Sequence, residues 1–385
     1  MYNAFRIPAN QKLLKVHHNQ FSVGAKMGWT SDEGLIVDIF ERCCKIPRAV
    51  GVYPYISRGK HILVSKFLVV YDLFLAVLII AFDCYWLINE PPLQESGNHT
   101  ITHFIRSAQL TMTCINVVMS SIWILWNKTK LQEMLDELVK FEDIIKPNNF
   151  KVCNKGLIAV VLLLTGLIVS HFIVNPISGY TGIAIYIRFQ LAVIMIFSNA
   201  AFFTRCTRIT GSAYFAITAQ LSDSKTYNSM KDIQKAMEHL VSASEALNTV
   251  FGPQLLSITS TSFVLNTGNT YLAITSNSTT ESLVSVIWVI ILSKLMLHII
   301  QTCSWTTEKA KELDKTFYRT VLEDKTGDLS QEVRVCLHFT NNRKIAFTAC
   351  GFFTIDFTLA GSMIAAATTY LVILIQIGGS EKSGG

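Results

Sequence analysis

With half of its 385 residues hydrophobic and only 16% charged, this chain is too apolar for a soluble domain, in which roughly a quarter of the residues are charged. The composition therefore predicts a membrane protein with several spans. The net charge of +6 does not indicate a nucleic-acid-binding protein, because the basic residues are concentrated in alternate loops. The nine cysteines include no CxxC pair and predict neither a disulfide framework nor a zinc site.

Seven apolar stretches follow a mixed, basic segment, 1–61, in which we expect no signal peptide. Each stretch is long enough to cross a bilayer as a helix. They cover residues 62–88, 105–126, 156–174, 183–204, 251–275, 282–303 and 346–377. The fifth is the most polar, and its hydroxyls and amides predict a face turned toward other helices or a cavity. These residues are Ser257, Thr259, Ser260, Thr261, Ser262, Asn266, Thr267 and Asn269.

Lysine and arginine mark one side of the membrane. The loops on that side, assigned as inner, are 1–61 with Lys66, 127–155, 205–250 and 304–345. The outer loops are 89–104, 175–182 and 276–281. The inner loops hold 29 of the 33 basic residues and the outer loops hold none. Because positive loops stay in the cytosol, we expect a cytosolic N-terminus and, after seven spans, an extracellular C-terminus.

Three N-x-S/T sequons test this orientation. It places Asn98 and Asn277 outside, where glycosylation is expected. Asn127 falls at the inner end of the second span and should stay unmodified.

The two longest inner loops after the fourth span carry helical patterns. An apolar stripe with spacings of three and four runs from Met230 to Val250, with Ser244 as its one polar position, and leads into span five. Pro253 should break or bend the chain there. A second helix is expected over Ala310–Val321 and a third through Val333 and Leu337. The patterns are typical of a cytosolic assembly domain or of amphipathic helices lying on anionic lipid.

The last apolar stretch is crowded with small residues, from Gly361 to Thr368, which let helices approach closely in lipid. As one helix its 32 residues would be about 48 Å long, so Gly361–Ile377 is expected to cross the roughly 30 Å core. The lone amide Gln376 near its end suits a helix interface or a water-filled path. We interpret this helix as meeting copies of itself around an aqueous pore.

The predicted fold is an all-α membrane protein with seven transmembrane helices and a cytosolic helical assembly domain. Its parts are a cytosolic N-terminal segment (1–61), helices one to six with inner extensions as ligand-binding domain (62–303), cytosolic anchor helices (304–345), a pore-lining helix (346–377) and a flexible tail (378–385). Motifs for nucleotide, metal or nucleophilic chemistry are absent from the sequence, so we expect no enzyme, no metal site and no cofactor.

The end of the last span reads Thr369-Tyr370, five apolar residues, Gln376 and Ile377. Together with the seven spans and the inner N-terminus, it resembles the insect gustatory receptor family, whose signature is TYhhhhhQF. Ile377 replaces the final Phe. The upstream run Cys350–Asp356 is also similar to this family.

The resemblance implies a homotetrameric, ligand-gated, non-selective cation channel in the plasma membrane, related to odorant receptors. The seventh helices would line one pore, with Ile373 and Ile377 as apolar gate and Gln376 as a polar ring. The ligand, a bitter plant compound or else a sugar, would bind in the outer half of spans two to six. A G-protein-coupled receptor would need the opposite orientation, and a secondary transporter would need broken helices and an internal repeat.

Candidate ligand residues combine aromatic rings with hydroxyls and amides at the depth that the resemblance implies. They are Ser107, Thr111, Ser170, His171, Tyr186, Arg188, Gln190, Asn269, Thr270, Tyr271 and Trp288. Each could instead serve helix packing, and Arg188 could pair with Asp83.

Overall fold

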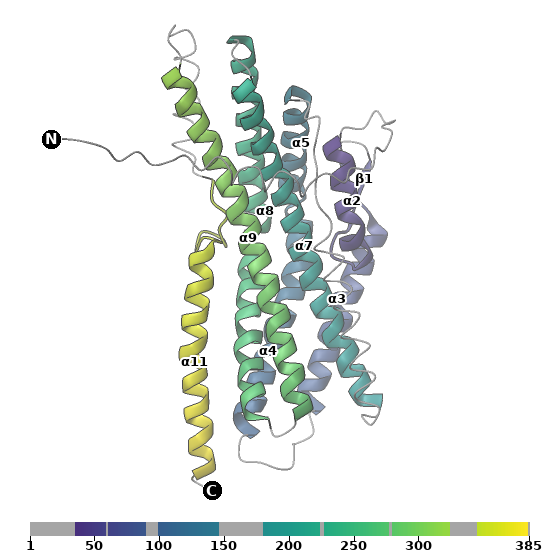
Figure 1. The fold of residues 1–385 in the computed structure, drawn as a ribbon. Coiled ribbons are helices and arrows are strands. Elements are labelled where there is room, and N and C mark those ends of the chain that lie inside the picture. Colours follow the sequence, from purple (N-terminus) through teal and green to yellow (C-terminus); the bar gives the residue numbers. More distant parts are fainter. Residues whose placement is uncertain are drawn as a thin grey trace, which may run out of the picture. The chain divides into compact units, whose positions relative to one another are not determined.

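The computed structural model describes residues 35–58, 61–89, 99–145, 180–223, 227–276, 279–323 and 345–383. The chain divides into two compact units, Met1–Asp32 and Glu33–Gly385, and the described residues all belong to the second. Its helices are α2 (Leu35–Ala49), α3 (Lys66–Asn89), α4 (His99–Trp126), α5 (Lys128–Ile145), α7 (Tyr180–Asp223), α8 (Tyr227–Thr275), α9 (Thr279–Glu323) and α11 (Phe357–Ser383). This confirms the predicted all-α fold (Figure 1).

Six of the seven predicted spans coincide with helices, and the third, 156–174, lies outside the described residues. Among the described residues, three helical segments are long and apolar enough to cross a membrane. They are Ile101–Trp126, Ser282–Thr320 and Phe357–Gly378. The span in α8 is more polar, as its many hydroxyls and amides led us to expect.

Three helices are far longer than a bilayer is thick. Helices α7, α8 and α9 contain 44, 49 and 45 residues, hence roughly 65–75 Å each, about twice the hydrocarbon core. They lie side by side, and each joins a predicted span to a loop helix without interruption (Figure 1). The patterns at 230–250 and 310–321 are therefore helical extensions of the bundle. The predicted helix through Val333 and Leu337 lies outside the described residues.

The break expected at Pro253 is wrong, because α8 continues through it. Proline removes one backbone hydrogen bond and crowds the preceding turn. The turn before Pro253 contacts another helix: the indole Nε1 of Trp123 on α4 donates to the carbonyl of Val250 at 2.9 Å.

The predicted stripe on α8 is the centre of the inner core. Ile233, Met237 and Leu240 are completely buried, and the polar position Ser244 is satisfied by the hydroxyl of Tyr214 on α7 at 3.0 Å. Helix α5, which we did not predict, packs along the same part of α8 with its own apolar face.

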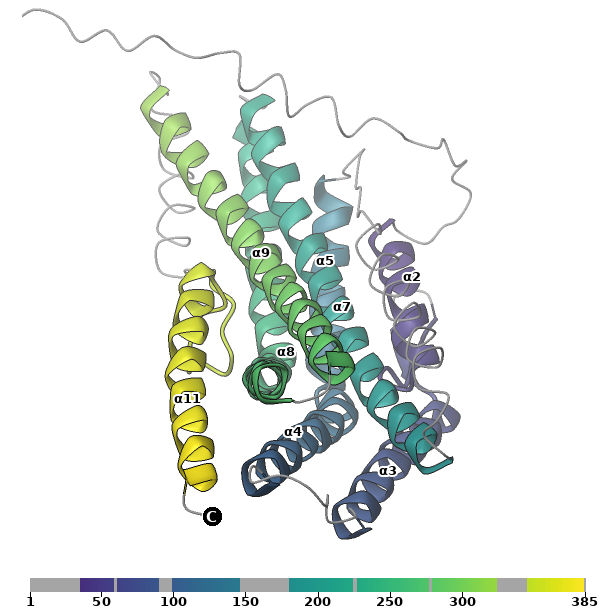
Figure 2. The same cartoon turned by 60° about the horizontal axis from the view of Figure 1, so that its bottom comes forward.

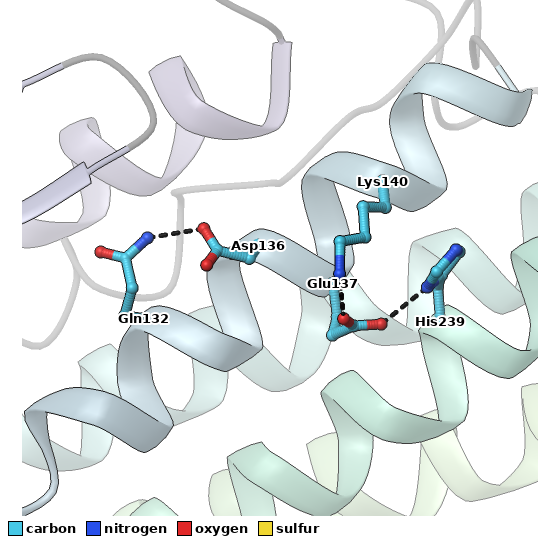
Figure 3. A network of polar contacts seen from close by, with 5 residues as sticks. All are labelled: Gln132, Asp136, Glu137, Lys140 and His239. Carbon is cyan, nitrogen blue, oxygen red and sulfur yellow. Dashed lines mark hydrogen bonds and ion pairs between the residues drawn. The ribbon is translucent and has the colours of Figure 1, made fainter.

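A polar network joins α5 to α8 at the edge of this core. Glu137 lies between Lys140 on its own helix and His239 on α8, with 2.7 Å to each (Figure 3). Burial favours the neutral form of Glu137, but the hydrogen bonds from Lys140 and His239 outweigh it and lower its pKa below the ordinary 4.5. Gln132 and Asp136 form a second contact on the same helix, at 2.6 Å.

Segment 35–64 adds α2 and a two-stranded antiparallel hairpin, β1 (Tyr55–Arg58) and β2 (His61–Val64), neither of which was predicted. Aromatic rings in edge-to-face or tilted contact connect this segment to the bundle and to the chain before α11. Successive centroids lie 4.9–6.4 Å apart. The rings are Phe40, Tyr53, Phe202, Phe251, Phe203 and Phe347.

Helix α11 stands at the side of the bundle, next to α8 and α9 (Figure 2). It begins at Phe357, so residues 346–356, expected to be helical, are not. It also continues to Ser383, so most of the predicted flexible tail 378–385 is helical.

Candidate functional site

The turn that precedes α11 is built from residues 347–355. Ala349 N donates to Phe353 O at 3.0 Å, and Ile355 N donates to Phe347 O at 2.8 Å, so the chain reverses on itself. Cys350 and Gly351 take positive φ angles of 52° and 79°, which an extended helix could not accommodate. This is why the apolar run from 346 is not helical.

Asp356 fixes the first residue of α11. Its Oδ1 accepts the backbone N–H groups of Thr358 at 2.9 Å and Leu359 at 3.4 Å, and its Oδ2 accepts the hydroxyl of Thr354 at 3.0 Å. This is the arrangement of a helix N-cap. The hydrogen bonds, that of the Thr358 side chain first, lower the pKa of Asp356 below its ordinary 3.8. The carboxylate therefore stays charged at the positive end of the helix dipole.

One face of α11 packs on its own bundle. The rings of Tyr370 and Phe263 on α8 meet edge to face at 5.9 Å. Leu371 and Leu374 pack against a buried cluster of Ile101, Ile105 and Tyr271.

The other face of α11 is uncovered. None of the residues in its most apolar window is buried against the rest of the described chain. The predicted gate residues Ile373 and Ile377 are 44% and 48% exposed, and Gln376 is exposed beside them. The same face carries the small residues Gly361, Ser362, Ala365 and Thr368. An apolar face of membrane length that its own subunit leaves uncovered can face lipid or another helix, and the small residues on it favour close approach of another helix.

The predicted ligand residues fall into three groups. Asn269, Tyr271 and Trp288 are buried between helices, with 9%, 0% and 7% of their surface exposed. By contrast, the hydroxyls of Thr111 and Thr270 donate to carbonyls of their own helices, Thr111 is exposed, and Ser107 is half-buried. Ser170 and His171 lie outside the described residues. For Tyr186, Arg188 and Gln190 on α7, and for Asp83 on α3, the structure describes the helix but not the side chains.

The buried part of the bundle contains many polar atoms that make no hydrogen bond to another described residue. Buried polar groups in proteins are nearly always bonded, so these atoms remain available to hydrogen-bond a molecule bound between the helices. On α4 and α7 they belong to Gln109, Asn116, Ser198 and Asn199. On α8 they belong to Gln254, Ser257, Ser262, Asn266, Thr267 and Asn269.

Helices α4 and α8 are in close contact beside this polar interior. A Cβ atom on Gly268 would lie 2.6 Å from Nε2 of Gln109 and 2.8 Å from Ile105. A side chain at this position would have to displace the Gln109 amide and the Ile105 methyl group. Sequence reasoning found the amides of α8 but missed Gln109 and Asn116, whose signal was their place inside an otherwise apolar span.

A separate cavity of about 550 Å³ opens at the end of the bundle that is formed by the loop extensions of α7, α8 and α9. It lies between α7, α8, α9 and the turn before α11, and none of the predicted ligand residues lines it. Its lining includes Met237, Glu308, Lys311, Asp314 and Phe347.

A family model for the 7tm chemosensory receptors matches residues 42–379, nearly the whole chain. The chain belongs to the 7tm chemosensory receptor family. The resemblance to a family of insect chemosensory receptors is thereby confirmed, while the choice between gustatory and odorant receptor stays open. No curated protein matches the receptor's sequence.

The receptor's fold is similar to solved structures of the insect olfactory receptor OR5 from Machilis hrabei. The structure in complex with eugenol shares 16% sequence identity and a TM-score of 0.63, covering 89% of this chain and 98% of OR5. A second structure of OR5 shares 16% sequence identity and a TM-score of 0.64, covering 88% of this chain and 98% of OR5. At this identity the likeness shows a common fold.

Proposed function

We propose that this receptor is a ligand-gated, non-selective cation channel of the plasma membrane. Four copies would surround one pore lined by α11, and a small tastant would open it. The observation that carries this proposal is the uncovered face of α11, which bears the two isoleucines and Gln376 on one side of a membrane-length helix.

A single helix cannot enclose a pore, so the uncovered faces must meet around a symmetry axis. Ile373 and Ile377 are four residues apart and lie on one helix face. Rings of their side chains would form a dry constriction that stops ions until a modest widening admits water. The uncharged amide of Gln376 beside them suits weak selection among cations.

The ligand would bind in the polar interior between α4, α7, α8 and α9. Tyr271 and Trp288 supply aromatic surface there, and Asn269 supplies an amide. The aromatic surface suits a small aromatic compound, and the many open polar atoms of the same interior could also bond a sugar. That OR5 was solved with eugenol is in keeping with the first of these ligand classes.

An odorant-type receptor channel is the second candidate, because the likeness in fold is to an olfactory receptor. A gustatory and an odorant-type receptor would open the same pore and would differ in the ligand that reaches the cell. A panel of volatile aromatic compounds, bitter non-volatile compounds and sugars, applied to the same expressed receptor, distinguishes them.

Current recording from cells expressing the receptor tests the channel. Ile377→Ser removes roughly three carbons' worth of apolar surface per subunit, about 2 kcal/mol, and should wet the constriction. We expect a basal sodium current well above that of the wild type. Leu374→Ser, on the packed face, is the matched control and should leave basal current low. Equal basal currents in the wild type and Ile377→Ser would contradict the proposal.

A further inference from the structure

A polar contact joins α8 to the turn before α11. Thr348 N donates to Oδ1 of Asn248 at 2.8 Å, and Nδ2 of Asn248 donates to the Thr348 hydroxyl at 3.2 Å. One amide side chain therefore holds both the backbone and the side chain of one turn residue. The hydroxyl oxygen of Thr348 also accepts Gly351 N at 3.2 Å, inside the turn.

Gly252 lies one helical turn beyond Asn248, on the same face of α8. A Cβ atom there would lie 3.3 Å from the backbone N of Cys350 and 3.6 Å from its Cα. Helix and turn are thus in backbone contact at Gly252 and hydrogen-bonded at Asn248. Phe347 and Ile355 anchor the same turn in the apolar core.

This contact lies just before the first residue of α11, a helix with little support of its own. Between Thr348 and the start of α11 the chain has only the turn and its capping residue Asp356. Along α8, Asn248 is 21 residues from Asn269, roughly 32 Å on a continuous helix. The same helix therefore reaches both the polar interior and the inner end of α11.

We propose that Asn248 is a positioning residue that pins the inner end of α11 to α8 and keeps the pore closed when no ligand is bound. This rests on the proposed channel function. Without the pin, α11 keeps its partial apolar contacts through Tyr370, Leu371 and Leu374 but gains freedom to tilt. Tilting widens the constriction that its exposed face forms with the other copies.

Four variants distinguish the effect of losing the hydrogen bonds from the effect of changing the size of the side chain. Asn248→Leu keeps the size of the side chain and loses both bonds. Asn248→Asp keeps both, because its two oxygens accept from Thr348 N and from the rotatable Thr348 hydroxyl. Thr348→Val loses the side-chain bond, and Thr348→Ser keeps it. Thr249→Val is the external control, since Thr249 is exposed and its hydroxyl donates to Glu245 O on its own helix.

The measurement is basal sodium current divided by the number of receptors at the cell surface. We expect about a tenfold rise for Asn248→Leu, which corresponds to 1.4 kcal/mol. Asn248→Asp and Thr348→Ser should recover most of the wild-type behaviour, and Thr249→Val should change nothing. The double variant Asn248→Leu/Thr348→Val should be less leaky than the two single effects combined, because both remove the bond between Nδ2 of Asn248 and the Thr348 hydroxyl.

The proposed role of Asn248 would be refuted if Asn248→Leu, at normal surface density, showed the basal current of the wild type. It would also be refuted if Asn248→Asp were as leaky as Asn248→Leu. A receptor in which neither the wild type nor Ile377→Ser carries current would instead refute the channel function. Hydrogen–deuterium exchange of residues 347–359 in the purified receptor then decides the pin alone. Faster exchange in Asn248→Leu than in Asn248→Asp supports it, and equal exchange refutes it.

Discussion

Asn269→Leu should make the ligand-free receptor more stable and less responsive. Asn269 is only 9% exposed, and its Nδ2 atom makes no hydrogen bond to another described residue. A buried polar group without a partner costs about 1–3 kcal/mol. Leucine has a similar size and carries no such group. We therefore expect the free energy of unfolding to rise by about 1–2 kcal/mol, and the melting temperature by a few degrees.

The same substitution at Asn199 is the matched control. Asn199 is also buried, and its Oδ1 makes no hydrogen bond to another described residue, but its Nδ2 donates to the Ser120 hydroxyl at 2.5 Å. Asn199→Leu loses that bond as well as the open Oδ1, so we expect its free energy of unfolding to be about 1 kcal/mol below that of Asn269→Leu. The two variants thus differ in whether a hydrogen bond is lost, although the chemical replacement is identical.

Thermal unfolding of the detergent-purified receptors measures the stability, and current evoked by a compound that activates the wild type measures the response. If the compound evokes the same current from Asn269→Leu as from the wild type, Asn269 does not belong to the ligand site. Equal losses of stability in both variants would refute the reasoning that the Asn269 amide is open.

Three further predictions concern topology, packing and pH. Asn98→Gln and Asn277→Gln should each remove a glycan detected by gel mobility, and a glycan at Asn127, whose Nδ2 donates to Trp123 O at 3.1 Å, would contradict the orientation. Gly211→Ala should lower the free energy of unfolding by about 1–2 kcal/mol. The new Cβ would meet the Trp305 ring and lie 2.7 Å from Oγ1 of buried Thr306. Unchanged thermal unfolding would refute this close contact of α7 and α9. Because its pKa is lowered on folding, charged Glu137 stabilises the fold above pH 4.5 and loses this contribution as the pH falls through its folded pKa. The wild type should thus be more stable than Glu137→Gln at pH 7, and the two should converge in acid; a constant difference would contradict the network.

Features that depend on local pattern could be predicted from the sequence. Apolar length located the six predicted spans that coincide with described helices, and the spacing of threes and fours identified the face of α8 that is buried between 230 and 250. Helix α5 carries the same kind of spacing, with Leu131, Leu135 and Leu138 buried, and could have been found.

Features that depend on distant residues could not be predicted. Helix α8 continues through Pro253, where Trp123 on α4 bonds the carbonyl of Val250, 127 residues away in the sequence. The turn before α11 reads as an apolar run, although Gly351 and the Asp356 cap were visible signals. For the ligand residues, depth in the membrane was predictable but helix rotation was not, so Thr111 lies exposed while Tyr271 and Trp288 lie inside.

The central claim is that the uncovered face of α11 lines a pore. Single cysteines placed at Ile373, Leu374, Gln376 and Ile377 test it, with a charged thiol reagent applied to the outer solution while sodium current is recorded. We expect the reagent to reduce current irreversibly through cysteines at Ile373, Gln376 and Ile377 and to have no effect at Leu374, which packs on the bundle. Block at Leu374, with current unchanged at the other three positions, would contradict the account.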